Sequence, residues 1–322
     1  MKPVTSWPDS LAVSIVVCTY NRADVLRSAL ETLRVQYAPL EFFEIIVVDN
    51  NSTDATPAVV EGFQKDMANL RYCFEPEQGL SHARNRGWRE AKGEYVAYVD
   101  DDCRMPVDWL GNALNVIERA APAAFGGPYK PWYQTPPPEW VKETYFSTLD
   151  KGDTARALGK GEYLSGGNFF AKREILEWLG GFDSALGMQG DDIGTGEETR
   201  LQIAIRDAVE GSDILYDPAL VVEHLVRLEK IRPWWLLRHR FQSGRYSQRV
   251  FSPETDSIAN RLAAAVSCGK CLILFLQSLC FGTVLRDRRR FPSVKNYFFE
   301  ETIPHVIGLG RAWERLLCHR GR

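Results

Sequence analysis

The sequence predicts an α/β protein with a mostly parallel central sheet flanked by helices, followed by a helical C-terminal extension. Three observations predict this class. Short continuous apolar runs, typical of strands covered on both faces, alternate with amphipathic segments of helical period. The connections are short, and polar residues follow the ends of several apolar runs. Beyond residue 230 the pattern becomes helical and basic.

The composition is that of an ordinary globular protein. The chain has 322 residues, of which 45% are hydrophobic and 25% charged, which argues against large-scale disorder. The net charge of −3 is unevenly divided, because residues 261–322 contain 11 Lys/Arg and 4 Asp/Glu. Seven cysteines without framework spacing indicate reduced thiols and a cytosolic setting. The N-terminal residues lack an apolar core segment, so no signal peptide is expected.

The first predicted strand is residues 13–18 (VSIVVC), a continuous apolar run that ends at Thr19. A helix follows, with Asn21 as its expected N-cap and a leucine stripe at i, i+4 and i+7. The stripe consists of Leu26, Leu30 and Leu33.

Two further strands are predicted at residues 43–48 and 70–74. The earlier one runs into Asp49 and is followed by a helix that breaks near Asn69. The later one leads through a polar turn into a helix that carries Arg84.

A fourth strand, residues 95–99, ends in three consecutive carboxylates, Asp100, Asp101 and Asp102. In an extended chain the first and third point to the same side. Two carboxylates about 4 Å apart repel by roughly 4 kcal/mol at an effective dielectric near 20, so such a pair needs a cation or a shifted pKa. Mg²⁺ and Mn²⁺ favour oxygen ligands and leave positions for substrate phosphates. The alternative is a solvated acidic turn.

Polar residues from three strands therefore converge. Thr19, Asp49 and the three aspartates follow strand ends, and ligands of parallel α/β sheets bind beyond those ends. The first strand is not followed by GxGxxG, and GxxxxGK[ST] is absent from the sequence, which sets aside dehydrogenase and P-loop classes. We therefore expect phosphates to be held by a metal and by cationic side chains.

The second half of the chain is less regular. A helix is predicted after Pro106, and residues 128–140, rich in proline and aromatic residues, are expected to be a loop. That loop either shapes a saccharide site or covers the core. A glycine pair, Gly166 and Gly167, interrupts an apolar run, which indicates close approach of backbone or ligand.

Glu197 and Glu198 begin a predicted helix with Leu201, Ile205 and Ala208 as its apolar stripe. Carboxylates at a helix N-terminus gain about 0.3–1 kcal/mol from the helix dipole, which is one explanation. The glycine-rich lead-in offers another, because a mobile loop that closes over a ligand could bring a catalytic base to it.

These motifs closely resemble those of family 2 inverting glycosyltransferases of the GT-A fold, over about residues 12–225. The matching segments, in order, are Thr19–Arg22, Val47–Asp54, Gly79–Gly87, Asp100–Asp102, Gly166–Asn168, Gly181–Asp183 and Gly196–Glu198. Because seven motifs match in the same order, the probability of a chance agreement is very small.

The resemblance implies a role for each matching residue. Asp49 accepts hydrogen bonds from the base, Asp102 ligates the metal, and Glu198 is the catalytic base, with Glu197 kept as the other candidate. His224 and Asp100 are expected near the metal. The implied nucleotide-sugar-binding residues are Thr19, Asn21, Arg22, Asp49, Arg84, Asp100, Asp101 and Gly167.

The implied activity is metal-dependent, inverting transfer of a sugar from a nucleotide-diphosphate donor, UDP first among them, to a saccharide or lipid-linked acceptor. The implied cofactor is Mn²⁺ or Mg²⁺, the setting is bacterial surface-polysaccharide synthesis, and nucleic acid is not an expected partner. One alternative is a non-catalytic nucleotide-sugar- or saccharide-binding accessory protein. A nucleotidyltransferase is disfavoured because its glycine- and lysine-rich phosphate loop is missing.

We expect three parts: a lead-in (1–11), a catalytic domain (12–230) and a basic helical extension (231–322). Within the extension, residues 262–285 have Lys270 as their one charge and precede an arginine cluster. The summed insertion energy is close to zero on a scale where each apolar residue contributes about −0.3 to −0.6 kcal/mol. A membrane span, a helix lying at the cytoplasmic leaflet of the inner membrane through 262–290, and a helix packed on protein all remain open.

Overall fold

The computed structural model describes residues 11–148, 151–190, 193–208, 213–251 and 257–317. These residues form two compact units. The first contains the described parts of Met1–Trp132, Phe146–Gly190 and Glu197–Leu225. The second contains those of Tyr133–Tyr145, Asp191–Gly196 and Val226–Arg322. The expected lead-in lies, except for Leu11, outside the described residues.

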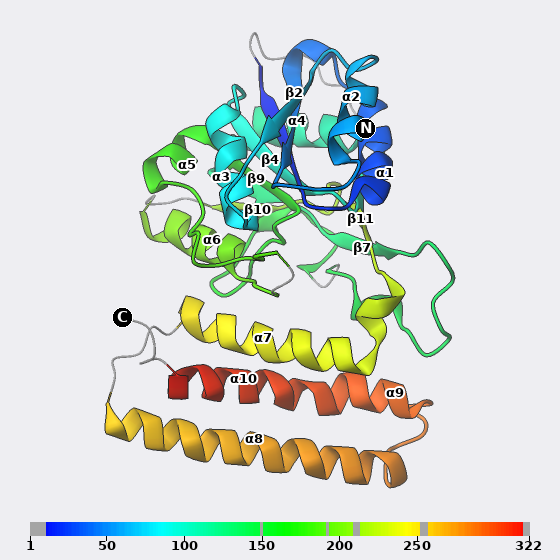
Figure 1. Ribbon diagram of the computed structural model, residues 1–322, viewed down its shortest axis with the longest axis vertical. Coiled ribbons are helices and arrows are strands. Elements are labelled where there is room, and N and C mark those ends of the chain that lie inside the picture. The colour runs from blue at the N-terminus through cyan, green and yellow to red at the C-terminus, as the bar shows by residue number, and fades with distance from the viewer. Residues whose placement is uncertain (1–10, 149–150, 191–192, 209–212, 252–256, 318–322) are drawn as a thin grey trace. The chain divides into compact units, whose positions relative to one another are not determined.

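An eight-stranded sheet forms the centre of the first unit (Figure 1). Its strands are β1 (Val13–Thr19), β2 (Phe43–Asp49), β3 (Leu70–Phe74), β4 (Tyr95–Asp100), β6 (Ala124–Gly126), β8 (Arg156–Ala157), β9 (Asn168–Lys172) and β10 (Ile214–Tyr216). The order is β3-β2-β1-β4-β9-β6-β10-β8. Pairs β2–β3, β1–β2, β1–β4 and β6–β10 are parallel, and β9 runs antiparallel to both neighbours. The predicted mostly parallel α/β sheet is confirmed.

Helices cover both faces of this sheet. They are α1 (Ala23–Arg34), α2 (Thr56–Gln64), α3 (Leu80–Glu90), α4 (Trp109–Ala120), α5 (Arg173–Leu179) and α6 (Glu197–Ala208), and a short 3-10 turn lies at Leu40–Phe42. Alternate residues of β1 divide between two cores, since Ile15 packs with α1, α2 and α4 whereas Val16 packs with α3, α5 and α6. The predicted leucine stripe of α1 is buried, but Ala208 of α6 is exposed.

Asn21 does not cap α1, which corrects the sequence-based expectation. The N-cap residue of the helix is Arg22, and its side chain makes no capping hydrogen bond to the backbone of the helix. Instead the Asp54 carboxylate accepts the hydrogen bond of the Ala23 amide, at 3.0 Å. The cap therefore comes from the next loop of the chain.

The expected loop at 128–140 begins with a strand, which is a second correction. A small sheet with the order β5-β11-β7 consists of β5 (Cys103–Arg104), β11 (Val222–Leu225) and β7 (Tyr129–Trp132). Proline is tolerated in β7 because this strand lies at the edge of the sheet, where a missing N–H costs no ladder bond.

The second unit is helical. Its elements are a 3-10 turn at Leu228–Ile231, α7 (Pro233–Phe251), α8 (Ile258–Val284), α9 (Val294–Tyr297), a π-helical turn at Phe298–Thr302 and α10 (Ile303–Leu317). Figure 1 shows α10 between α7 and α8. Helices α7 and α10 approach closely at Gly244 and Gly310, where a Cβ would overlap the backbone of the other helix. Glu314 of α10 pairs with Arg245 and Arg249 of α7.

Candidate functional site

The parallel register brings three predicted strand ends together. Thr19 lies opposite Asp49 on β2, and Cys18 lies opposite Asp100 on β4. All of these residues stand at the carboxyl edge of the sheet, where loops rather than helices cover the strand ends. The first unit thus has the strand-end convergence that the sequence predicts.

The loops after β1 and β2 hold each other in place. Asn21 and Asn51 adopt positive φ angles of 51° and 65°, which asparagine tolerates better than most residues. The exposed Asn21 side chain accepts a hydrogen bond from the Thr53 amide at 2.7 Å. Asp49 is fully buried, and its two oxygens accept hydrogen bonds from the Ser52 amide and the Tyr72 hydroxyl. Asp49 is therefore held rigidly.

Asp101 is buried and held by two side chains. It accepts a hydrogen bond from the Thr19 hydroxyl at 2.8 Å and an ion pair from Arg22 at 2.6 Å. Burial raises the pKa of Asp101, although the Arg22 guanidinium opposes the shift. The same guanidinium binds Asp102 Oδ2 at 2.8 Å. Arg22 therefore clamps two adjacent carboxylates.

Asp100, Asp102 and His224 form a group that fits a divalent metal. One ligand atom from each lies within 4.8 Å of the others, and among the described residues no second His/Cys/Asp/Glu group meets this criterion. His224 Nε2 is 3.4 Å from Asp102 Oδ1, and Arg22 Nη2 binds the other oxygen, Oδ2, at 2.8 Å. The two carboxylates are hard ligands that suit Mn²⁺ or Mg²⁺, and the borderline imidazole favours Mn²⁺ over Mg²⁺.

Tyr129 supports this group from β7. Its ring stacks on His224 with centroids 5.0 Å apart, and its hydroxyl donates to Asp100 Oδ2 at 3.2 Å. Two of the three candidate ligands thus take their orientation from one tyrosine, as outer-shell partners of metal sites do.

Gly167 packs against the Asp100 carboxyl group so closely that a Cβ there would overlap it. Gly167→Ala is therefore expected to displace Asp100 and weaken Mn²⁺ binding about 10- to 100-fold, the range seen for changes around metal ligands. Calorimetric titration with Mn²⁺ measures this. Gly62→Ala is the matched control, because a Cβ at Gly62 meets nothing within 4 Å. Unchanged Mn²⁺ affinity in Gly167→Ala would contradict the assignment of Asp100.

A second charged cluster joins α3 to the start of α6. Arg84 is buried; its Nη1 binds Glu197 Oε1 at 2.7 Å and its Nη2 lies 3.5 Å from Asp100 Oδ1. This guanidinium connects the metal group to the acidic pair. Oxygen Oε2 of Glu197 and of Glu198 is buried without a hydrogen-bond partner among the described residues.

The two glutamates differ in their electrostatics. Burial, together with the charge of Glu197, raises the pKa of Glu198 to about 8, against the opposing effect of Arg84. Arg84 contacts Glu197 directly, so the proton that the pair retains resides on Glu198. A carboxylate with such a pKa is suited to accept a proton near neutral pH.

The structure brings the predicted site residues together at this edge, with one exception. Asn21 is exposed to solvent beside the 51–54 loop. The mobile-loop expectation before α6 is not tested, and residues 191–192 lie outside the described residues. Sequence reasoning missed Tyr72 and Tyr129. Tyr129 sat in a segment interpreted as a loop, and nothing near Tyr72 in the sequence marks it as a partner of Asp49.

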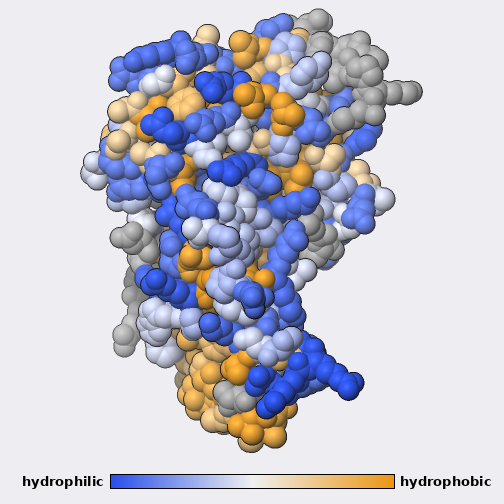
Figure 2. All heavy atoms as spheres, turned by 90° about the vertical axis from the view of Figure 1, so that its right-hand side faces the viewer, coloured by the Kyte–Doolittle hydropathy of each residue, from blue (hydrophilic) through white to orange (hydrophobic). Residues whose placement is uncertain are grey.

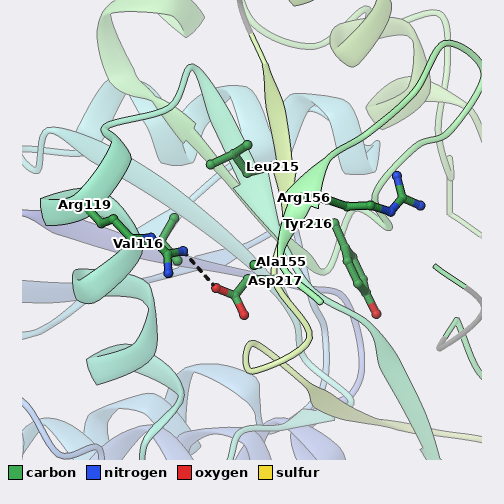
Figure 3. A pocket seen from close by; sticks show the side chains of 7 residues that line it. All are labelled: Val116, Arg119, Ala155, Arg156, Leu215, Tyr216 and Asp217. Carbon is green, nitrogen blue, oxygen red and sulfur yellow. Dashed lines mark hydrogen bonds and ion pairs between the residues drawn. The ribbon is translucent and has the colours of Figure 1, made fainter. Parts of the chain in front are cut away.

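A separate hollow of about 230 Å³ lies between α4 and strands β8 and β10 (Figure 3). It is lined by Val116, Arg119, Ala155, Arg156, Leu215, Tyr216 and Asp217. Arg119 pairs with Asp217 across it, as the dashed line in Figure 3 shows, and Arg156 pairs with Glu162. Its lining shares no residue with the strand-end clusters, so the hollow is not part of the candidate site.

Comparisons with known proteins agree on one family. The family model described as "Glycosyl transferase family 2" matches residues 14–180, slightly more than half of the chain. Succinoglycan biosynthesis protein ExoM of Rhizobium meliloti is 28% identical over 309 residues, which cover 94% of each protein. Glucosyl-dolichyl phosphate glucuronosyltransferase of Haloferax volcanii is 28% identical over 254 residues, 74% of this chain and 77% of that protein.

A solved structure shares the fold. Mannosyltransferase PcManGT from Pyrobaculum calidifontis, solved with GDP-Man and Mn²⁺, superimposes with a TM-score of 0.60 at 21% identity. The match covers 98% of this chain and 90% of that one.

Proposed function

The chain belongs to glycosyl transferase family 2, and from this premise we propose that it is a metal-dependent, inverting enzyme that uses a nucleotide-diphosphate sugar, with UDP the first donor to test. Family membership and the named relatives support a GT-A-fold glycosyltransferase of glycan synthesis. The finer proposal rests on one observation: Arg84 links the candidate metal group to the acidic pair, Glu197 and Glu198, at the sheet edge.

The donor binds along that edge in our proposal. Asp49, braced by Tyr72 and Ser52, accepts hydrogen bonds from the base through lone pairs that those groups leave available. The loop carrying Asn21 borders the base or ribose. Asp101 holds Thr19 and Arg22 in place, because it accepts the hydrogen bond of the Thr19 hydroxyl and pairs with the Arg22 guanidinium.

Asp100, Asp102 and His224 would hold the divalent ion beside the donor diphosphate. When bound, the ion stabilises the negative charge that grows on the departing nucleoside diphosphate. Arg84, buried and always charged, adds a fixed positive charge between the diphosphate and the acidic pair. The residues that hold these charges are positioned before the donor arrives, so little reorganisation opposes the reaction.

Glu198 accepts the proton of the acceptor hydroxyl in this mechanism. The acceptor oxygen forms a bond to the anomeric carbon as the bond from that carbon to the diphosphate oxygen breaks. The bonding pair leaves with the nucleoside diphosphate, and attack from the opposite face inverts the anomeric configuration. Only one carboxylate is needed, since the leaving diphosphate departs without a general acid.

The acceptor and the setting come from the relatives. One is named for succinoglycan biosynthesis and the other for transfer to a glucosyl-dolichyl phosphate. We therefore propose a saccharide or lipid-linked acceptor. We also propose a location on the cytoplasmic face of the inner membrane, which the long apolar helix α8 supports. Residues 12–230 would be the catalytic part, and residues 231–322 the extension that carries it.

Release of nucleoside diphosphate tests the proposal. Purified protein with Mn²⁺ or Mg²⁺ is expected to hydrolyse slowly one member of a panel of UDP-, GDP- and dTDP-sugars, and EDTA is expected to stop the release. The released nucleotide identifies the base. Metal-independent release would contradict the metal assignment. If no donor gives release and no donor shows metal-dependent nucleotide binding, the non-catalytic accessory protein is favoured.

A further inference from the structure

Helix α8 packs against its neighbours through small side chains. Ala264, Cys271, Ser278 and Gly282 recur every seven or four residues and therefore share one helical face. Ser278 and Thr302 hydroxyls lie 2.8 Å apart, and Gly282 is in such close contact with Tyr297 that a Cβ would overlap its ring. Cys271 lies against Gly308 of α10. This inner face is small and mildly polar.

The opposite face is large and apolar. Its exposed aliphatic and aromatic residues include Leu262, Val266, Ile273, Leu276, Phe281 and Val284. Val266 and Val284 are 72% and 74% exposed. Figure 2 shows the apolar colour gathered over the part of the second unit that α8 occupies, beside strongly hydrophilic residues. A helix in water has the reverse arrangement, while small residues inside and large apolar residues outside are typical of helices in lipid.

The charges around α8 favour an anionic surface as the cover of this face. The helix contains no Asp or Glu, and its exposed Lys270 can extend its ammonium group along the surface. Directly after it come Arg286, Arg288, Arg289 and Arg290. Asp287 and Glu301 offset part of this charge, since Arg290 pairs with Glu301. The remaining excess of arginine matches the headgroups of anionic lipids.

Helix α8 is long enough to cross a bilayer and, by length and composition, is the one described helix with this property. Its packing argues against crossing. Along its inner face it lies on α9, the π-helical turn and α10, and α10 carries Glu314, which pairs with two arginines of α7. If α8 stood upright in the membrane, these charged groups would enter the hydrocarbon, at a cost of several kcal/mol for each charge.

We propose that α8 lies in the plane of an anionic membrane, with its outer face in the acyl-chain boundary and the arginines that follow it among the phosphates. A helix of 27 residues at about 1.5 Å per residue presents an apolar strip about 40 Å long, a broad contact for a monotopic protein. The inference stands apart from the transfer reaction, because it requires neither a donor nor a metal.

Vesicle flotation of the purified full-length chain tests the proposal. It is expected to float with phosphatidylglycerol-containing vesicles and bind phosphatidylcholine vesicles much more weakly. The double variant Ile273→Glu, Leu276→Glu should lower partitioning at least tenfold, since two apolar side chains then leave the lipid. Arg288→Gln with Arg289→Gln should lower binding to anionic vesicles about 25-fold, at roughly fivefold for each arginine. The control is Val107→Glu, which introduces a glutamate at an exposed apolar residue outside α8. Val107 lies just before α4 and is 56% exposed.

Three results would overturn the proposal. The first is undiminished flotation of the Ile273→Glu, Leu276→Glu chain. The second is resistance of the wild-type chain to alkaline carbonate extraction from inner-membrane vesicles, which would indicate a span. The third is absence of vesicle binding together with a dimer in lipid-free solution that the same double substitution disrupts. The outer face of α8 would then be covered by a second copy of the chain. Circular dichroism and donor hydrolysis show that each variant is folded, and hydrolysis is expected to be unchanged.

Discussion

Glu198→Gln is expected to lower kcat about 10²- to 10⁴-fold, the range in which a general base contributes, while the Kd for the donor changes little. Glutamine keeps the size of the side chain and cannot accept the acceptor proton. Glu198 makes no described contact with the metal group, whose link to the acidic pair runs through Arg84 and Glu197. Steady-state kinetics with a saturating acceptor, beside equilibrium donor binding, separate the two effects.

Glu197→Gln is the matched control for that variant. Glu197 binds Arg84 directly at 2.7 Å, so its loss should disturb the guanidinium and raise the KM for the donor more than it lowers kcat. If Glu197→Gln shows the large kcat defect and Glu198→Gln does not, the base is Glu197, and the roles proposed for the two glutamates are exchanged.

The same residue predicts a pH dependence. Because Glu198 must be ionised to act, kcat/KM should rise with pH and level off above about 8, the raised pKa of this carboxyl. Stability should change in the opposite direction. A carboxyl with a raised folded-state pKa stabilises the chain below its usual value of 4.5, and this contribution is lost as the pH rises through about 8. In Glu198→Gln, urea titrations should show a flatter pH dependence of the free energy of unfolding over this window.

Asp102→Asn is expected to lower metal-dependent turnover by roughly 10³-fold, the equivalent of several kcal/mol of charge stabilisation. The substitution preserves shape, so it removes the negative charge that faces His224 without opening a cavity. The Mn²⁺ concentration for half-maximal activity should rise in parallel. Activity is followed across an Mn²⁺ titration after EDTA treatment of the protein.

Asp101→Asn provides the comparison at the adjacent carboxylate. Asp101 is equally buried and shares Arg22 with Asp102, but it is not in the metal group. It should therefore retain the Mn²⁺ dependence of the wild type, even if Arg22 is held less firmly. Equal shifts in the Mn²⁺ requirement of both variants would show that the loss arises from Arg22 and would remove Asp102 from the proposed ligand set.

Local pattern was sufficient for the core of the first unit. Apolar runs of five or six residues predicted β1, β2 and β4, because strands buried on both faces are mostly apolar; Ser14 and Glu44 are the buried polar residues within them. The register of parallel strands then determines that Thr19, Asp49 and Asp100 meet at one edge, so the site's position followed from the sequence. The acidic pair at the start of α6 was likewise visible as a motif.

Pairing between distant segments decided the rest. Arg84 meets Glu197 across 113 residues, and Tyr129 meets His224 only because β7 pairs with β11. The proline-rich sequence of β7 predicts a loop, and only its place at a sheet edge makes a strand there stable. The cap of α1 came from Asp54 rather than Asn21 for the same reason, as a neighbouring loop supplied the acceptor.

The sequence by itself determined the α/β class, the family resemblance and the edge at which the polar residues gather, because these depend on local periodicity and on strand geometry. Tertiary structure alone decided which oxygen of Asp102 faces His224, which glutamate Arg84 holds, and which side of α8 is covered. Those outcomes depend on contacts between residues far apart in the chain, whose free energies no local pattern records. In α8 the composition left a span, a surface helix and a packed helix open; the structure shows that its small residues pack on α10 and its neighbours, and contact of the outer face with a membrane is our proposal.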